Sequence, residues 1–281
     1  LEAPPFQAAA IGLVPVSGEL ALTLPPGEYE VVVTRGPEFS AWPDTWPAAA
    51  RRVDLRAQDA LVEAVVGRVV DSRGWLSADL HVHAVRSADS GVTNAQRAAR
   101  FLAEGVDVLL STDHEYVTDY APVVRALGAE HLMATMVGEE LTTVAHGHYN
   151  VFPMRRQPLA TGGAFDHAAG EDAPTYRLPQ LFPAIKAAQP GAVVQLNHPR
   201  GMLGALTLLK VDTATLASHG VAADYLMEPA PDATADDAKL FGAGFDAMET
   251  ATGTSPSTTS LNDWMTFLSR GTVRAATAVS D

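Results

Sequence analysis

The stretch Ala78-Asp79-Leu80-His81-Val82-His83 ends in two histidines that are separated by one valine. Alternate side chains of a β-strand point to the same face, so we expect His81 and His83 to face the same way. Two imidazoles at the end of a strand are suited to hold a metal ion. Two isolated histidines are more often ordinary surface or core residues, so the metal hypothesis depends on the residues at the ends of the other strands.

Composition limits the classes of protein to consider. The chain has 281 residues, enough for one large or two medium-sized domains. It contains no cysteine, so disulfides and thiolate zinc sites are excluded, and any metal must bind His, Asp or Glu. The net charge is −14 and no basic cluster is present, which argues against a broad nucleic-acid surface. No run of about 18 apolar residues occurs, so no membrane span is predicted.

Residues 1–74 have the alternating pattern of β-structure. Leucines alternate over Leu20–Leu24, a Pro-Pro-Gly turn follows, and Tyr29–Val33 alternates again, which predicts a hairpin. The stretch Leu24–Val31 resembles carboxypeptidase-regulatory-like β-sandwich modules, which are common on exported proteins. This resemblance implies a sandwich-like segment and favours a periplasmic or extracellular location over the cytoplasm. A β-extension packed on the next domain is the alternative.

Residues 75–281 alternate instead between short apolar runs, typical of buried strands, and segments with the apolar spacing of helices. Helices are predicted over Thr93–Gly105, Tyr120–Leu127, Leu178–Gln189 and Ser260–Arg270, and strands over Val106–Thr112, Leu132–Gly138, Tyr149–Pro153, Ala192–Leu196, Phe245–Thr250 and Val273–Ser280. With the strand that carries His81, this makes seven strands. The pattern predicts an α/β fold of the seven-stranded (β/α) barrel type after the β-rich N-terminal segment.

Histidines and carboxylates gather at the ends of these predicted strands. They are His81, His83 and Asp89 after the first strand, Asp113 and His114 at the end of the second, Glu139 and Glu140 at the end of the third, His148 at the start of the fourth, His198 after the fifth and Asp281 at the end of the seventh. Active sites of α/β barrels lie at the carboxyl ends of their strands. The sequence therefore predicts a metal centre.

The motifs together resemble those of the PHP (polymerase and histidinol phosphatase) family. They are Asp79-Leu80-His81-Val82-His83 followed by Asp89, then Thr112-Asp113-His114, Gly138-Glu139-Glu140, Gly147-His148 and Asn197-His198-Pro199. Their longer forms, which extend to Thr143, Asn150 and Arg200, resemble the branch that contains carbaryl and carbofuran hydrolases. The resemblance covers about residues 75–281. It implies a distorted seven-stranded barrel, two or three divalent ions (zinc, manganese or iron), and hydrolysis of a phosphate ester or a related bond.

The resemblance also implies which residues bind the metals. His81 and His83 would hold one ion together with Glu140 and Asp281. Glu140 would bridge to a second ion, which His148 completes with His114 as a further candidate. His198 and Asp89 would belong to a third, more variable position. The family pattern is Gly-x-Glu, which selects Glu140 over Glu139, and Asp113 is expected to orient its neighbour.

Two features of the sequence leave alternatives open. The family ends its last strand in Asp-x-His, whereas this sequence ends at Asp281, so we interpret it as truncated before a further histidine ligand. Arg200 comes directly after a ligand motif and suits a phosphoryl anion, although a salt bridge at the rim of the barrel is an equal alternative.

The expected function is a metal-dependent phosphoesterase in which a metal-activated hydroxide attacks phosphorus. Glu140, His114 and Arg200 are the candidate catalytic residues. One alternative is a carbamate or carboxylic ester hydrolase that uses the same site. A different class is a non-catalytic, metal-stabilised module of an exported surface protein. The expected partner is a small phosphate ester or carbamate.

Several further residues are given ordinary roles. His131, His167 and His219 lie in polar or irregular stretches and are expected to be exposed, while His146 could face either a pocket or solvent. Core packing is preferred over a pocket role for Tyr116 and Tyr149, and Glu249 is expected to be a supporting group or part of a buried pair.

Overall fold

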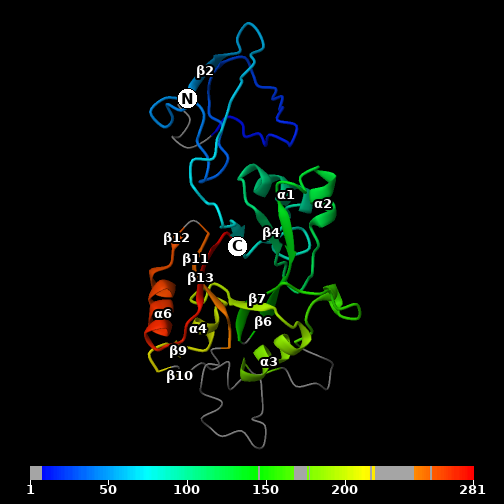
Figure 1. The fold of residues 1–281 in the computed structure, drawn as a ribbon, viewed down its shortest axis with the longest axis vertical. Helices are drawn as coiled ribbons and strands as arrows, with labels where there is room; N and C mark the ends of the chain where they lie inside the picture. Colours follow the sequence, from blue (N-terminus) through cyan, green and yellow to red (C-terminus); the bar gives the residue numbers. More distant parts are fainter. Residues whose placement is uncertain are drawn as a thin grey trace, which may run out of the picture. The chain divides into compact units, whose positions relative to one another are not determined.

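The computed structural model describes residues 8–144, 146–167, 176, 178–215, 217–218, 244–253 and 255–281. The chain forms two compact units. Unit 1 contains the described residues up to Ala78 together with Ala95–Val108 and Ala121–Ala134. Unit 2 contains Asp79–Asn94, Leu109–Tyr120 and the described residues from Thr135 to Asp281. Each unit shows a mixture of colours in Figure 1, because segments distant in sequence join to form it.

The N-terminal part of unit 1 is built on one small sheet. Strand β1 (Glu28–Val31) pairs antiparallel with β2 (Arg51–Asp54), with Glu28 opposite Asp54. The predicted hairpin between Leu20–Leu24 and Tyr29–Val33 is therefore wrong. Leu20 and Leu22 are 44% and 51% exposed, so their alternation does not mark a buried strand face.

All four predicted helices are confirmed, and the first two in the chain are α1 (Asn94–Ala103) and α2 (Ala121–Ala126). Helix α1 buries Ala98 and Leu102, as its apolar spacing requires, and α2 buries Val124. Gly105 follows α1 with a φ of +70°, a conformation that glycine adopts without steric cost at the end of a helix.

A six-stranded sheet forms the frame of unit 2. Its order is β12-β11-β8-β7-β6, and β13 pairs with β11 as a branch from this path. The strands are β6 (Glu139–Thr143), β7 (Gly147–Phe152), β8 (Val193–Leu196), β11 (Ala247–Thr252), β12 (Ser255–Pro256) and β13 (Ala275–Val279). A separate three-stranded sheet contains β3 (Ala78–Asp79), β4 (Val108–Ser111) and β5 (Ala134–Val137), and β9 (Val211–Asp212) pairs with β10 (Ala217–Ser218).

The predicted seven-stranded (β/α) barrel is wrong, because the described strands form open sheets of mixed direction. Strands β6 and β7 are antiparallel and are joined by residues 144–146 alone. A link this short suits a hairpin, whereas parallel strands need a crossover of about a dozen residues or more. Strand β7 is also antiparallel to β8. Strand β6 was not predicted, since the sequence pattern placed Glu139 and Glu140 at the end of the preceding strand.

Parallel pairing occurs on both sides of β11. Strand β11 is parallel to β8 and to β13, and α6 (Thr258–Ser269) lies between β11 and β13 in sequence and contacts β11 (Figure 1). Ser257 caps α6 by accepting a hydrogen bond from the backbone N–H of Ser260 at 3.2 Å, so the start of the helix lies before the predicted Ser260.

The core of unit 2 lies between the sheet and its helices. In α3 (Leu178–Ala188), Phe182 contacts Tyr149 of β7 edge-on at 5.3 Å between ring centroids. Gly147 has a φ of +88°, and a Cβ there would lie 2.4 Å from the backbone nitrogen of Ala205 in α4 (Ala205–Leu208). A glycine at the start of β7 therefore lets α4 approach the strand that carries His148.

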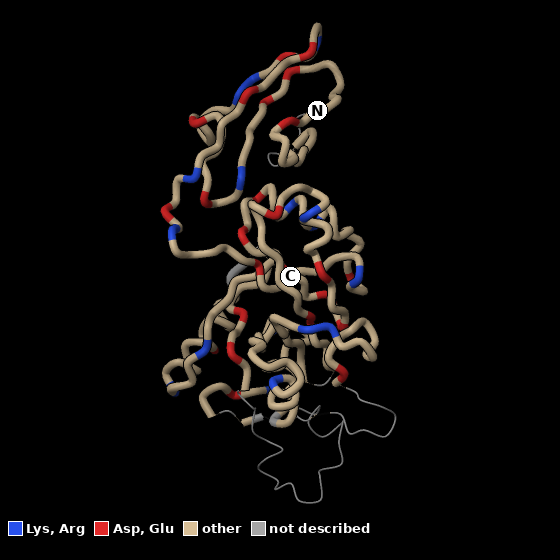
Figure 2. Tube along the Cα trace, turned by 45° about the vertical axis from the view of Figure 1, so that its right-hand side comes forward, with Lys and Arg blue, Asp and Glu red and all other residues tan. Residues whose placement is uncertain are grey.

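The described part of unit 2 is completed by the short 3-10 helix η1 (Thr161–Gly163). No described helix is both long and apolar enough to cross a membrane. Lys and Arg residues are few and scattered along the trace in Figure 2, as the net charge of −14 leads one to expect.

Candidate metal centre

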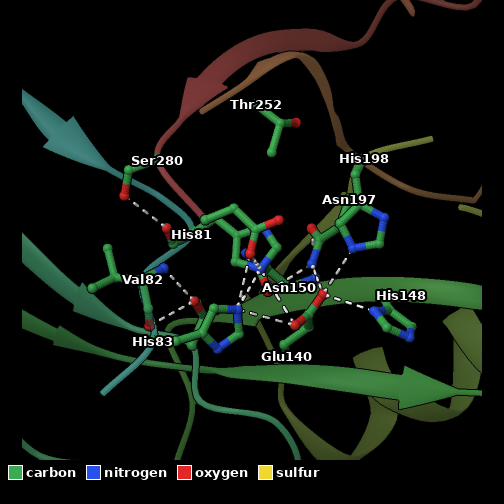
Figure 3. A network of polar contacts seen from close by, with 12 residues as sticks. His81, Val82, His83, Glu140, His148, Asn150, Asn197, His198, Thr252 and Ser280 are labelled. Atoms are coloured by element: carbon green, nitrogen blue, oxygen red, sulfur yellow. Dashed lines mark hydrogen bonds and ion pairs between the residues drawn. The ribbon is translucent and has the colours of Figure 1, made fainter. Parts of the chain in front are cut away.

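The carboxylate of Glu140 lies at the centre of the cluster, on β6 and fully buried. Its Oε1 atom accepts a hydrogen bond from Asn197 Nδ2 at 2.9 Å. The same oxygen lies 3.1 Å from His148 Nδ1 and 3.3 Å from His198 Nε2. Figure 3 shows these three side chains turned toward Glu140 from one side.

The second oxygen of Glu140, Oε2, faces three other imidazoles. It lies 2.9 Å from His114 Nδ1 and 3.3 Å from the Nε2 atoms of both His81 and His83. None of these contacts has the alignment of a hydrogen bond, so this buried oxygen has no hydrogen-bond partner. Buried polar atoms in proteins are nearly always satisfied. A carboxylate oxygen surrounded by ring nitrogens, yet bonded to none, fits a cation.

His81 and His83 converge as their strand pattern predicted. Their Nε2 atoms lie 2.9 Å apart, and Asp281 Oδ1 lies 3.1 Å from each of them. Ligands around a tetrahedral zinc ion lie about 3.4 Å apart when the bonds are about 2.1 Å long. The three atoms are thus close enough to share one ion. The backbone N–H of Asp281 also donates to the carbonyl of His81 at 3.0 Å.

Three overlapping groups in the described part of the chain could each hold an ion, with the ligand atoms of each group within 4.8 Å of one another. They are His81, His83 and Asp281; His83, Asp89 and His114; and His114, Glu140 and His148. Buried histidines and Glu140, together with the more exposed Asp89, His114 and Asp281, thus lie within metal-binding distance of one another. His198 lies beside these groups through its contact with Glu140.

Glu249 on β11 fixes the orientation of His81 by contacting Nδ1, the ring nitrogen that does not face Glu140. Its Oε1 atom lies 2.7 Å from His81 Nδ1 and accepts from Gln195 Nε2 at 3.0 Å, and its Oε2 accepts from Thr252 Oγ1 at 3.1 Å. The backbone N–H of His198 also donates to Glu249. A carboxylate at Nδ1 favours the tautomer that leaves Nε2 free to bind a metal.

Ser87 connects two of the imidazoles. Its hydroxyl lies 2.9 Å from His83 Nδ1 and accepts the backbone N–H of His114 at 3.1 Å. His114 itself lies at the more open side of the centre. Its Nε2 is 3.4 Å from Asp89 Oδ2, and Asp89 has a half-exposed side chain.

Glu139 and Glu140 point in opposite directions. Both oxygens of Glu139 accept the backbone N–H of Phe165 at 3.0 Å, away from the imidazoles. Burial raises the pKa of Glu139 to about 8. Burial alone would also raise the pKa of Glu140, but the imidazoles around it hold that pKa well below its usual value. Glu140 is therefore an anion at neutral pH.

The charged state of His81 depends on the same contacts. Burial would lower the pKa of His81, but the carboxylates of Glu140 and Glu249 raise it well above the usual value. The cluster thus favours positive charge next to Glu140, and a divalent ion would supply the same charge once the histidines lose their protons.

Two candidate residues face away from the centre. Asp113 accepts the backbone N–H of Ala84 at 2.6 Å and the hydroxyl of Thr118 at 2.5 Å, so it holds the backbone of the loop that follows His83. Arg200 makes a bidentate pair with Asp263 at 2.6 and 2.8 Å. These contacts favour the interpretation that Arg200 forms a salt bridge. Arg200 is therefore not among the proposed catalytic residues.

Buried amides support Glu140 and Glu249, and the sequence alone did not predict them. Asn150 Nδ2 donates to the carbonyl of Leu80 at 2.7 Å, and Asn150 Oδ1 accepts from Asn197 Nδ2 at 2.8 Å. Gln195 Nε2 reaches Glu249. The available signal was that these fully buried amides lie in or beside otherwise apolar strands, where a polar side chain needs a partner.

The remaining histidines differ in their surroundings. His146 is buried, and burial lowers its pKa to about 4, while His131 is exposed as predicted. His167 is only partly exposed and its Nε2 lies 3.3 Å from Glu115 Oε1. His219 lies outside the described residues.

The chain was compared with models of protein families and with curated proteins, and neither comparison found a match. The chemical interpretation of the centre is therefore argued from its residues and their geometry.

Proposed function

We propose that the protein is a metal-dependent hydrolase, and most specifically a phosphoesterase, whose central ligand is Glu140. The observation that supports this proposal is the division of contacts between the two oxygens of one buried carboxylate. His148 and His198 lie at Oε1, and His81, His83 and His114 lie at Oε2. A carboxylate placed in this way suits the bridging position of a centre with two metal ions.

The groups of side chains suggest where ions would bind. His81, His83 and Asp281 would hold one ion, and His114, Glu140 and His148 would hold a second. Asp89 would contribute to a third position with His83 and His114. With no thiolate in the sequence, these nitrogen and carboxylate ligands suit zinc, manganese or iron.

Bound divalent ions would supply Lewis acidity, which lowers the pKa of water at the site and stabilises the negative charge that develops on the scissile group. The protein's own residues prepare the site for that chemistry. Glu140 and His81 are shielded from water, while His114 and Asp89 are 21% and 51% exposed in their side chains. A substrate would approach from the more exposed side of the centre, where His114 and Asp89 lie.

The residues of this proposed centre are the same residues that carry the resemblance to the PHP family. We extend the proposal to the phosphoester hydrolysis that the resemblance implies. The barrel that it also implies is not part of the proposal, because the sheets are open.

The direct test combines elemental analysis with hydrolysis assays. Protein purified without chelators is expected to contain bound transition metal and to hydrolyse p-nitrophenyl phosphate or its diesters faster than p-nitrophenyl carbamates. The double variant His81→Ala/His83→Ala should lose most of the metal and the activity, since it removes two nitrogens from the centre.

His131→Ala is the matched control, because His131 is an exposed histidine outside the cluster. Metal content that is unchanged in the double variant would contradict the metal centre. Full metal content without hydrolysis of any phosphate ester would contradict the phosphoesterase proposal and favour a non-catalytic module that is stabilised by metal.

A further inference from the structure

Two arginines share one aromatic ring close to the proposed centre. The guanidinium carbon of Arg86 lies over the ring of Tyr116 at 5.3 Å from its centroid, and that of Arg156 lies over the same ring at 5.5 Å. Both arginines are exposed, while Tyr116 is partly buried. These distances are within the range of cation–π contacts, so the ring holds both cations in place.

Adjacent glycines create the space for this arrangement. Gly162 has a φ of +65°, and a Cβ there would lie 3.1 Å from Tyr116 Cδ2 and closer still to the carbonyl oxygen of Glu115. Gly163 has a φ of +77°, and a Cβ there would collide with the side chain of Arg156. The turn at η1 is thus shaped so that the stem of Arg156 crosses it toward Tyr116.

Two of these three residues, Arg86 and Tyr116, lie close to candidate ligands along the chain. Arg86 lies three residues after His83 and Tyr116 two residues after His114, so their Cα atoms are within about 11 and 7 Å of those ligands. Arg86 lies within the turn closed by the bond from the Ser87 N–H to the carbonyl of Ala84 at 2.8 Å. The backbone N–H of Tyr116 donates to the carbonyl of Asp113 at 3.3 Å.

The two guanidiniums have no anion of their own among the described residues. Several other arginines in the described part of the chain pair with carboxylates, for example Arg68 with Glu38 and Arg200 with Asp263. The carboxylate nearest in sequence to Tyr116 is Glu115, which already accepts the Thr142 N–H at 2.5 Å and contacts His167. Arg35 and Arg68 lie over Phe39 in a similar way, but Arg68 is also paired with Glu38, whereas neither Arg86 nor Arg156 is paired with a carboxylate among the described residues.

We propose that Arg86, Tyr116 and Arg156 form an oxyanion-binding clamp for the leaving group of the substrate. This inference rests on the proposed function. The substrate would be a phosphate ester whose alcohol or phenol part carries a second anionic group, a carboxylate or a phosphate. The metal centre would bind the scissile phosphate, and the guanidinium N–H groups would donate to the second anion in the planar geometry that arginine favours.

The test uses ligands that the enzyme cannot hydrolyse, so that binding is measured apart from turnover. Phenylphosphonate, 4-carboxyphenylphosphonate and 1,4-phenylenediphosphonate are titrated calorimetrically into metal-loaded protein. We expect the ligands with a second anion to bind at least about tenfold more tightly than phenylphosphonate, as two charge-assisted hydrogen bonds would give. The carboxylate and diphosphonate arms show which second anion the clamp prefers.

Substitutions assign the preference to the clamp. Arg86→Gln/Arg156→Gln should bind all three ligands equally and retain the affinity for phenylphosphonate. Tyr116→Phe should keep the preference, because it keeps the ring, and Tyr116→Leu should reduce it. Arg155→Gln is the matched control, since it removes the same charge from the neighbouring exposed position.

Equal binding of the three ligands by the unaltered protein, or a preference that survives the double substitution, would overturn the clamp. Absence of binding by any phosphonate would overturn it as well. Metal content and hydrolysis of phenyl phosphate are measured on the same samples. If both persist while the preference is absent, the clamp alone fails, whereas metal-loaded protein without hydrolysis contradicts the proposed function.

Discussion

Glu139 and Glu140 show how far a single residue's role depends on which way its strand faces. They are adjacent on β6 and equally buried, yet one accepts a backbone N–H and the other lies among five imidazoles. Strand alternation separates them completely. The Gly-x-Glu pattern in the sequence indicated the same residue as the central one.

Substitution of each glutamate by glutamine should separate their roles. Glu140→Gln removes the negative charge that two ions would share, so we expect loss of metal and at least about a hundredfold loss in kcat/KM for a phosphate ester. Glu139→Gln keeps an oxygen for the Phe165 N–H and should retain most of both. Metal analysis and steady-state kinetics measure the outcome. A greater loss of metal and activity in Glu139→Gln than in Glu140→Gln would contradict the assignment of the bridging position to Glu140.

Among the elements, the β6–β7 hairpin is the one that most changes the expected fold. The helices and most of the longer strands other than β6 were recognisable from their spacing, and α1, α2, α3 and α6 lie close to their predicted positions. The arrangement of these strands and helices could not be predicted, because local spacing does not show whether the next strand returns antiparallel or crosses over to pair in parallel. Gly138, directly before β6, allows the backbone to approach β7 closely, because a Cβ there would lie 2.7 Å from the carbonyl oxygen of Val151.

The loop after β8 illustrates a residue role that only packing reveals. Arg200 follows the His198 motif in sequence, but its guanidinium binds Asp263 of α6 and the carbonyls of Leu206 and Val211 at 3.1 and 3.2 Å. The pair thus ties the loop that carries His198 to a helix. Nothing in the sequence near Arg200 indicates a partner 63 residues away.

Arg200→Gln is therefore expected to act on stability. It leaves the buried Asp263 carboxylate with Thr213 as its remaining partner, at 3.0 Å, and should cost about 3 kcal/mol. For a chain of this size that corresponds to a fall in Tm of roughly 6–12 °C. Calorimetry and kinetics below the transition should show lowered Tm with kcat within about threefold of the unaltered protein. A large fall in kcat at unchanged Tm would restore Arg200 as a catalytic residue.

At the scale of the whole molecule, all candidate ligands lie in unit 2. They are His81, His83, Asp89, His114, Glu140, His148, His198 and Asp281. The sequence brought these residues to notice because they lie at the ends of predicted strands, and the structure does place them close together although the described strands form no barrel. The structure of the β-rich N-terminal part of unit 1 was less predictable, since alternating apolar residues such as Leu20 and Leu22 are exposed there.

Removal of metal should affect the two units differently. A ligand that binds only the folded state stabilises the region that holds it. After treatment with a chelator, we expect faster amide hydrogen exchange in β6, β7, β8 and β13 and unchanged exchange in β1 and β2. Peptide-resolved mass spectrometry measures this, and restored protection after metal is added back is the control. An equal change in both units would show that the ions do not bind in unit 2 alone.

The contact between Asp281 and the strand end at His81 has a consequence for how the protein folds. It joins residues 200 positions apart, through the Asp281 N–H to the His81 carbonyl and through the carboxylate to both imidazoles. Contacts of such high sequence separation form slowly, because a long loop must close before they contribute. The first group of ligands is therefore complete only after β13 has joined the sheet, and ions that arrive earlier meet a partial set. Metal binding at the proposed centre should thus follow chain collapse rather than guide it.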